Sequence, residues 1–325
     1  MTGGRNGAAF VHQASVYGSQ DEFLAMAVPF VEDGLSRGEP VLATTTSANL
    51  ALLGENLGEG WQRVDQAESA YFGRRTSQRV AAFDRYWRRQ APAGGHVRIL
   101  AEPIWSGRSD HEVAAWARME STLNVVLSAT NIWMICPYDT RVASPEVVAG
   151  ARRTHPTRMR GITAEPCPEF IDPAIFTRAC DADSLPDPPA SAALLDGGRD
   201  LAGLRRFMAV QAATLGLTGE RAYLLVTAAN EAATCLLAKG SGRITARAWA
   251  EAGSIVCDLR QPASRLADPF LGFRPPTSEP SGDDGLWLAR QLCDAVDLRT
   301  DEDGCTVRLQ VPGPRAEDAR QAARA

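Results

Sequence analysis

Polar and aromatic side chains recur at helical spacing between residues 111 and 128. Glu112, Trp116, Glu120 and Asn124 follow one another at intervals of four residues. In a helix this spacing places them on one slowly drifting stripe, in which two carboxylates flank an indole. Such a stripe can line a ligand pocket, or it can belong to a buried polar network that fixes the helix to its neighbours.

Further polar and aromatic residues lie near the ends of strand-like segments. They are His12, Tyr17, Glu102, Trp105, Cys136, Tyr138 and Asp139. The carboxyl ends of parallel strands meet at one edge of a sheet, so these residues and the 112–124 stripe are candidates to line a sensor pocket there. The alternative is a structural network in which Trp105 and Trp116 are core residues.

Two more chemical possibilities concern histidines of the first half. A metal held by His12, Cys136 and Asp139 is chemically possible, but no ligand spacing supports it, so no metal is expected. His155, within Arg-Arg-Thr-His-Pro, is expected to be a surface or interdomain contact rather than a catalyst.

The segments that must position these residues alternate between strand and helix patterns. Strands are predicted at 14–17, 40–44, 96–100 and 132–136, and helices at 20–37, 48–57, 77–90 and 111–128. This alternation predicts an α/β domain with a mostly parallel sheet covered on both faces. The first strand–helix turn lacks a Gly-x-x-x-x-Gly-Lys-Ser/Thr signature, and Asp21 and Glu22 occupy the first helical turn. We therefore expect no nucleotide phosphate at this turn.

The second half has a different pattern, which predicts an α+β sandwich. Helices are expected at 200–215, 219–239 and 286–293, and hairpins at 243–250 with 254–260 and at 296–299 with 305–311. A long loop at 261–284 is rich in Pro and Gly. The segment 179–191 is too rich in Pro for a helix or a strand and is predicted to be a linker.

Several short segments of the second half together resemble the GHKL ATPases. They are Asn-Glu-Ala-Ala-Thr at 230–234, Asp-Pro at 268–269, Gly-Leu-Trp at 285–287, Gln-Leu-Cys-Asp at 291–294 and Asp-Gly-Cys-Thr-Val-Arg at 303–308. Their order most resembles the anti-sigma-factor serine kinase branch, over about residues 190–312. The resemblance implies a GHKL (Bergerat) α/β sandwich, and ATP with Mg²⁺ as the family's cofactors.

The ATP motifs of that family are degenerate in this chain. Glu231 matches the catalytic Glu, although it can also be a helix-surface or capping carboxylate. Cys235 replaces the Mg²⁺-binding Asn, and a thiol is a poor ligand for a hard cation. The other degenerate positions are Gln261 and Ala263 for the adenine-binding Asp-x-Gly, and Asp283 with Gly285 for the last Gly-x-Gly. We therefore expect no cofactor, with ATP and Mg²⁺ bound only if the degenerate site still functions.

A second resemblance covers the first half, at about residues 9–178. Its ordered segments are 12–17, 21–23, 29–35, 102–105, 136–139 and 152–156. Together they resemble the MEDS sensory domain, which is often fused to a domain of the GHKL kind and implies a RecA-like α/β fold. The predicted domains are thus 9–178 (MEDS-like), 179–191 (linker), 192–314 (GHKL-type) and 315–325 (tail).

Charge and cysteine content indicate which kinds of partner and which cellular compartment to expect. The net charge of −5 and pI near 5.5 favour neither nucleic acid nor an anionic membrane as partner. The seven cysteines include no Cys-x-x-Cys pair, and no apolar run reaches the ~18 residues of a membrane span. A cytoplasmic protein with reduced thiols is expected.

These features predict a signal-sensing regulator of a bacterial partner-switching (anti-sigma factor) pathway. Its first domain would receive a small-molecule or protein signal. Its second, a pseudokinase, would bind a sigma factor or an anti-sigma antagonist through the helical face that carries Leu204 and Phe207. The alternatives are an active Mg·ATP-dependent serine kinase, and a ligand-binding protein whose second half forms a homodimer. All four histidines precede the linker, which argues against a conventional histidine kinase.

Overall fold

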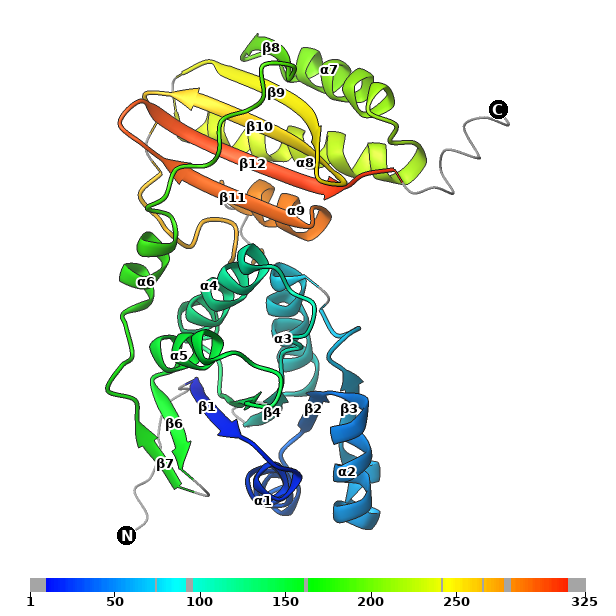
Figure 1. Cartoon of the computed structure of the whole chain (residues 1–325), viewed down its shortest axis with the longest axis vertical. Coiled ribbons are helices and arrows are strands. Elements are labelled where there is room, and N and C mark those ends of the chain that lie inside the picture. The colour runs from blue at the N-terminus through cyan, green and yellow to red at the C-terminus, as the bar shows by residue number, and fades with distance from the viewer. Residues whose placement is uncertain are drawn as a thin grey trace. The chain divides into compact units, whose positions relative to one another are not determined.

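The computed structural model of the chain describes residues 10–73, 75–91, 96–160, 163–240, 242–264, 266–277 and 282–314. The chain forms two compact units, Met1–Cys180 and Asp181–Ala325, and the division falls within the linker predicted at 179–191 (Figure 1). The predicted domain start at residue 9 and the predicted tail at 315–325 lie outside the described residues.

The N-terminal unit is built on a seven-stranded sheet with the order β3-β2-β4-β5-β1-β6-β7. Its strands are β1 (Val11–Tyr17), β2 (Val41–Thr45), β3 (Asp65–Glu68), β4 (Val97–Ala101), β5 (Ile132–Asp139), β6 (Thr157–Arg160) and β7 (Thr163–Pro166). All neighbours pair in parallel except β6 and β7. Every residue of β2 and β4 is buried, as expected for strands between two helical layers. The predicted mostly parallel sheet is confirmed.

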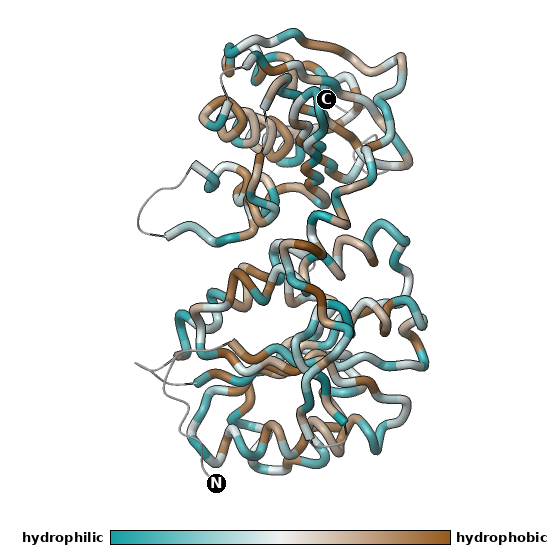
Figure 2. Tube along the Cα trace, turned by 90° about the vertical axis from the view of Figure 1, so that its left-hand side faces the viewer, coloured by the Kyte–Doolittle hydropathy of each residue, from teal (hydrophilic) through white to brown (hydrophobic). Residues whose placement is uncertain are grey.

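Helices cover both faces of this sheet (Figure 1). On one face α1 (Gln20–Ser36) and α2 (Ser47–Leu57) bury Phe23 and Leu53 against it, with the 3₁₀ segment η1 (Gly58–Arg63) beside them. On the other face α3 (Thr76–Gln90), α4 (Asp110–Val126) and α5 (Pro145–Thr154) bury a second core. The last helix of the unit, α6 (Pro173–Cys180), contacts α4. Apolar residues accordingly concentrate in the central strands (Figure 2).

Local sequence explains where several of these helices begin. Ser19, Thr46, Ser109 and Ser144 precede α1, α2, α4 and α5, and each hydroxyl accepts a hydrogen bond from a backbone N–H of the first turn. Such caps satisfy amides that have no partner within the helix. The starts of these helices are therefore set by the residues at their own ends.

The C-terminal unit is built on a five-stranded antiparallel sheet with the order β11-β12-β10-β9-β8. Its strands are β8 (Ala193–Gly198), β9 (Ile244–Glu251), β10 (Ser254–Pro262), β11 (Ala295–Thr300) and β12 (Gly304–Pro312). Its helices are α7 (Leu201–Thr214), α8 (Gly219–Lys239) and α9 (Asp284–Leu292), and α8 buries a run of alanines against the sheet. Both hairpins and all three helices predicted here are present, which confirms the α+β class.

The opposite face of this sheet is covered by the chain that precedes β8. Arg308 of β12 donates a hydrogen bond to the Pro186 carbonyl, and Arg299 of β11 donates to the Asp183 carbonyl and pairs with Asp181. The first part of the predicted linker is therefore ordered against its own unit.

The elements that the sequence did not predict are short or lie at an edge. They are β3, β6, β7, β8, α5, α6 and η1. The strands β3 and β7 carry mostly exposed residues, so they lack the apolar alternation that marks a strand. Within the described part of the chain, no helix has the length and hydropathy that a membrane-spanning segment needs.

Candidate functional site

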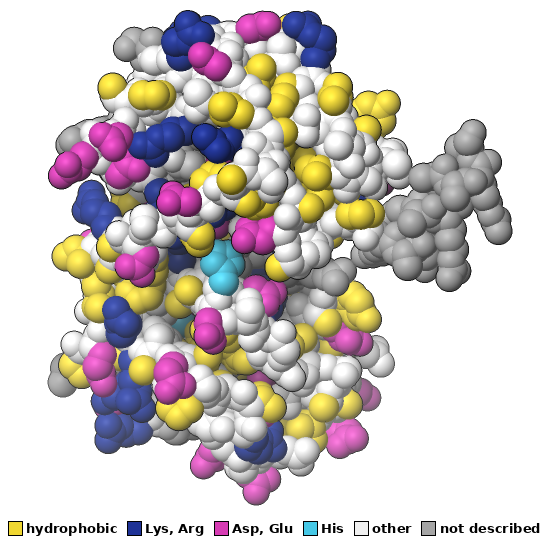
Figure 3. Space-filling model, turned by 45° about the horizontal axis from the view of Figure 1, so that its top comes forward, with side chains coloured by type: hydrophobic (Ala, Val, Ile, Leu, Met, Phe, Trp, Pro, Cys, Tyr) yellow, Lys and Arg dark blue, Asp and Glu magenta, His cyan; other side chains and the backbone are white. Residues whose placement is uncertain are grey.

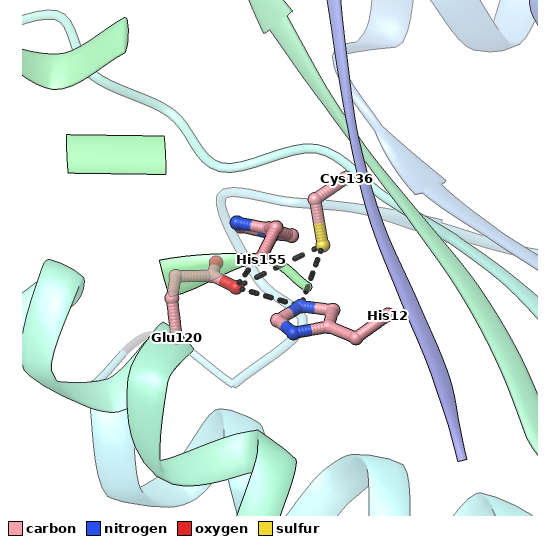
Figure 4. Close-up of side chains that lie close together, drawn as sticks. All are labelled: His12, Glu120, Cys136 and His155. Carbon is pink, nitrogen blue, oxygen red and sulfur yellow. Dashed lines mark hydrogen bonds and ion pairs between the residues drawn. The ribbon is translucent and has the colours of Figure 1, made fainter. Parts of the chain in front are cut away.

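Four buried side chains meet inside the N-terminal unit, on the face of the sheet that α4 and α5 cover. His12 comes from β1, Cys136 from β5 and Glu120 from α4, and His155 is the residue that ends α5. Glu120 Oε2 lies 3.3 Å from His12 Nε2, 3.6 Å from His155 Nε2 and 3.8 Å from Cys136 Sγ. His12 Nε2 lies 3.4 Å from Cys136 Sγ. Figure 4 shows these four side chains converging on one point.

The second nitrogen of each imidazole is held by a neighbouring group. His12 Nδ1 lies 3.1 Å from the Asn124 amide oxygen, and His155 Nδ1 lies 2.8 Å from the Ala151 carbonyl. Burial lowers the pKa of both imidazoles to about 3, so both are neutral at physiological pH. Burial likewise raises the pKa of Glu120 and that of Cys136.

The position of His155 corrects the sequence-based expectation. It is fully buried, and its ring lies against that of His12 with centroids 3.9 Å apart and planes tilted by 37°, so it is a core residue of the N-terminal unit and not a surface contact. Asp139, which the sequence grouped with His12 and Cys136, instead forms an ion pair with Arg141. Sequence reasoning missed His155 as a site residue because only the end of α5, itself not predicted, brings it to β1.

A second polar cluster gathers around Glu102 at the carboxyl ends of β1, β2 and β4. Tyr17 donates a 2.5 Å hydrogen bond to Glu102 Oε1, and the Asn49 amide donates to Oε2 at 2.8 Å. Thr45 also donates to Glu102 Oε2. Burial and the Glu102 carboxylate raise the pKa of the Tyr17 phenol. This carboxyl group is therefore fully engaged with protein donors.

An aromatic layer lies against the His12 cluster, that is, against His12, Glu120, Cys136 and His155. Trp105 stacks on Tyr138 at a ring-centroid distance of 5.8 Å and meets the edge of Trp116 at 6.3 Å. Tyr138 in turn meets His155 edge-on at 5.8 Å. The indole nitrogens of Trp105 and Trp116 have no hydrogen-bond partner within the described residues.

The four members of the 112–124 stripe do not share one environment. Glu120 and Asn124 belong to the His12 cluster and Trp116 to the aromatic layer. Glu112 is exposed and accepts a hydrogen bond from the Ser109 amide, which closes the capping box of α4. The residues that the sequence grouped together are thus divided between two buried polar clusters; Glu112 lies outside both, and Asp139 pairs with Arg141 beside Tyr17.

Backbone amides at the first strand–helix turn are bonded to the chain's own side chains. The Glu22 carboxylate accepts a 2.6 Å hydrogen bond from the Gly18 amide, and the Ser19 hydroxyl caps α1. The helix N-terminus is thus neutralised by the chain itself, as the sequence indicates.

In the C-terminal unit the residues at the family's ATP positions are buried or bonded to neighbouring side chains. Glu231 is half-buried on α8 and accepts a hydrogen bond from Asn230. Cys235, one turn later, is 2 % exposed, and burial raises the pKa of its thiol to about 11. Lys239 forms a 2.5 Å ion pair with Asp283, which raises the pKa of the Lys239 ammonium. The Lys239 ammonium and the Asp283 carboxylate thus neutralise each other, and among the described residues Glu231 is bonded only to a neutral amide.

Gln261 lies at the end of β10 on the side of the sheet that faces α8. Its side chain is fully buried and donates a 3.3 Å hydrogen bond to the Gly242 carbonyl, while its amide oxygen is buried without a partner among the described residues. Ala263 adopts φ +56°, the left-handed conformation that favours glycine, which is the family's residue at this position.

Asp258, the other acidic residue near this motif, lies on the opposite face of the sheet. It alternates with Cys257 and Leu259, which face the core, and forms a bidentate ion pair with Arg308 at 2.7 Å. Gly285, the second residue of α9, lies so close to α8 that a Cβ atom there would be 2.6 Å from the Glu231 carbonyl oxygen.

These side chains do not fit Mg·ATP. Mg²⁺ prefers oxygen ligands, and Cys235 offers a buried, protonated sulfur. The adenine amino group needs an acceptor presented to the ligand, and Gln261 is enclosed by protein. Asp283, although paired with Lys239, places a carboxylate where backbone amides should meet the phosphates.

On α7, the helix predicted to contact a partner, the two residues that mark it in the sequence face inward. Leu204 is 4 % exposed and belongs to the core of the C-terminal unit, and Phe207 packs against that core. The exposed apolar residues on these helices are Val210 of α7 and Tyr223 of α8. A small surface hollow lies among β8, α7, α8 and β9, and Ala233 and Leu237 of α8 help to line it. Ala233 is two residues from both Glu231 and Cys235, which places it about 200° from them around the axis of α8. The hollow is therefore on a different side of α8 from the ATP positions.

Comparison with known protein families agrees with the division of the chain into two units. Residues 11–156 match the MEDS family, the methanogen/methylotroph DcmR sensory domain, and residues 198–311 match the histidine kinase-like ATPase domain. No curated protein matches the chain. The N-terminal unit of this chain is therefore a MEDS domain, and its C-terminal unit is a histidine kinase-like (GHKL) ATPase domain.

Proposed function

We propose that this chain is a signal-sensing regulator whose GHKL domain acts by binding a protein partner and not by using ATP. A sensory domain joined to an ATPase-like domain fits a signalling regulator. Within that class we assign the chain to a partner-switching pathway, in which its C-terminal domain binds a sigma factor or an anti-sigma antagonist. The resemblance of the motifs at 230–234, 285–287 and 303–308 to anti-sigma-factor serine kinases supports this assignment.

One observation carries the proposal: Gln261 stands in place of the adenine-binding carboxylate and is enclosed. Its side chain is fully buried and bonded to Gly242, and a Cβ atom on Gly240 would lie 2.3 Å from its amide oxygen. An acceptor packed this closely is not available to an incoming base. The buried Cys235 and the Lys239–Asp283 pair support the same conclusion at the metal and phosphate positions.

Surface features are compatible with regulation through protein contact. On the face seen in Figure 3, acidic and basic side chains are interspersed with apolar ones. Val210 and Tyr223 expose 59 % and 75 % of their area on α7 and α8. Exposed apolar side chains on these two helices are available for contact with a protein partner.

Calorimetric titration of Mg·ATP into the full-length chain tests the proposal. We expect no binding heat from the wild type, with folding verified by circular dichroism. The double variant Cys235→Asn with Gln261→Asp restores the family's residues and shows whether the site is merely degenerate or also closed. Micromolar binding by the wild type that Glu231→Ala abolishes would overturn the proposal and favour an active serine kinase.

A further inference from the structure

We propose that His12, Glu120, Cys136 and His155 bind one zinc ion inside the MEDS domain. This inference concerns a site separate from the GHKL domain and does not depend on the proposed function. All four ligand atoms lie within 4.8 Å of one another, and all four residues are buried. The sequence grouped His12, Glu120 and Cys136 in one candidate pocket, but no ligand spacing marks a metal site, because the four members come from four separate segments.

Four of the six separations among the ligand atoms lie near the edge lengths of a zinc tetrahedron, and the other two are within 4.8 Å. Zinc binds sulfur at ~2.3 Å and nitrogen or oxygen at ~2.0–2.1 Å, which puts neighbouring ligand atoms about 3.3–3.6 Å apart. The separations from Glu120 Oε2 to His12, His155 and Cys136 are 3.3, 3.6 and 3.8 Å, and that from His12 to Cys136 is 3.4 Å. The separation of 3.6 Å between His155 and Glu120 is too long for a hydrogen bond, but it suits two ligands of one ion.

The neighbours of both imidazoles fix the tautomer that metal binding needs. The acceptors at Nδ1 are the Asn124 amide oxygen for His12 and the Ala151 carbonyl for His155. Each Nδ1 therefore carries the proton, and each Nε2 presents a lone pair to the cluster (Figure 4). A carbonyl or amide oxygen behind a histidine ligand is the usual second-shell arrangement of zinc sites.

Without an ion the cluster is poorly satisfied. His155 Nε2 is buried and has no hydrogen-bond partner among the described residues. The opposing groups, Cys136 and Glu120, can supply only one proton each, and only in their neutral forms. Zinc accepts all four lone pairs at once. On binding, the thiol and carboxyl protons leave to solvent, and the two resulting negative charges balance the dication.

The donor set selects the class of metal. A thiolate with two imidazoles favours zinc or a similar borderline transition metal over Mg²⁺ or Ca²⁺, which prefer oxygen. Four protein ligands complete a tetrahedron and leave no open position, as in structural zinc sites. The ion would tie β1, β5, α4 and α5 together at the centre of the domain.

The test measures metal in the full-length chain. Chelator-stripped protein is reloaded with Zn²⁺, and bound metal is counted by mass spectrometry after gel filtration. We expect one zinc per chain, and X-ray absorption of this form should show one sulfur at ~2.3 Å and three nitrogen or oxygen neighbours at ~2.0–2.1 Å. Reloading with Co²⁺ should give the visible bands of tetrahedral cobalt and a thiolate charge-transfer band.

Variants assign the ligands. Cys136→Ser should abolish the charge-transfer band, whereas Cys257→Ala, which removes an equally buried thiol from the C-terminal core, should retain it. Asn124→Leu removes the acceptor behind His12, together with the hydrogen bond that the Asn124 amide donates to the Thr154 carbonyl, and should weaken zinc binding by about 10–100-fold in chelator competition. Folded wild-type protein that retains no metal, or a metal site without sulfur, would overturn the proposal even if no ligand variant folds.

Discussion

Tyr17 at the end of β1 donates a hydrogen bond of 2.5 Å to Glu102, which follows β4, although β5 lies between these two strands in the sheet. The same carboxylate accepts from Asn49, the third residue of α2. Glu102 is 3 % exposed and therefore depends on these donors instead of water. It connects the carboxyl ends of strands with the helix layer on one face of the sheet.

Removing the Tyr17 hydroxyl should destabilise the chain. Tyr17→Phe leaves one oxygen of a buried carboxylate without its donor, which costs about 1–3 kcal/mol. Tyr86→Phe removes a hydrogen bond to Asp65 at the surface, where water can replace it, and should cost under about 1 kcal/mol. Urea unfolding of both variants gives the comparison, and equal losses would mean that Glu102 is not held by Tyr17.

Breaking the Asp258–Arg308 pair should be among the most damaging changes in the GHKL domain. Their side chains are 8 % and 5 % exposed, so Asp258→Ala leaves a buried guanidinium unpaired at a cost of about 3–5 kcal/mol. The control is Asp196→Ala, which breaks an exposed pair with Arg243 and should cost at most about 1 kcal/mol. Thermal and denaturant unfolding distinguish the two. A small loss for Asp258→Ala would show that solvent reaches Arg308.

Ala263→Gly should stabilise the fold. Ala263 has φ +56°, and a left-handed residue with a Cβ atom costs about 1–2 kcal/mol, of which part is offset by the greater freedom of glycine in the unfolded chain. We expect a net gain of up to about 1 kcal/mol in the free energy of unfolding. Ala209→Gly, at an exposed position within α7, should lose about 1 kcal/mol. A loss at both positions would contradict the left-handed conformation of Ala263.

Gly285→Ala should separate α9 from α8. The added methyl would lie 2.6 Å from the Glu231 carbonyl oxygen, and relieving this overlap should cost about 1–3 kcal/mol. Gly150→Ala within α5 meets no atom within 4 Å and should gain about 0.5–1 kcal/mol. If Gly285→Ala were as well tolerated as Gly150→Ala, α9 would not pack against α8 in solution as it does in this structure.

The thiol of Cys235 should resist alkylation. Burial raises its pKa to about 11, so only about one molecule in a thousand carries the reactive thiolate at pH 8. Iodoacetamide labelling followed by peptide mass spectrometry should modify the half-buried Cys180 first, with Cys235 reacting only after unfolding or at much higher pH. Rapid labelling of Cys235 at pH 8 would indicate that the degenerate ATP site opens.

Much of the architecture follows from local sequence. Helix α8 begins at Gly219 and ends at Lys239 as its apolar period predicts, and the Asp303–Gly304 turn places the last hairpin correctly. Helix spacing also put Glu120 and Asn124 on one face of α4. These features depend on neighbours a few residues apart, and the sequence displays such neighbours directly.

Only the tertiary structure decided which of these residues meet. The sequence grouped Cys136 and His12 with Asp139. In the structure, parallel pairing of β1 with β5 aligns Asp139 with Tyr17, and Asp139 pairs with Arg141. The end of α5 instead brings His155 to His12. Glu112 has the spacing of a site residue, yet its position at the start of α4 makes it a cap. Strand register and helix docking are set by contacts between distant segments. The spacing of residues along the chain therefore showed where a side chain lies on its own element, and only the packed domain determined its partners.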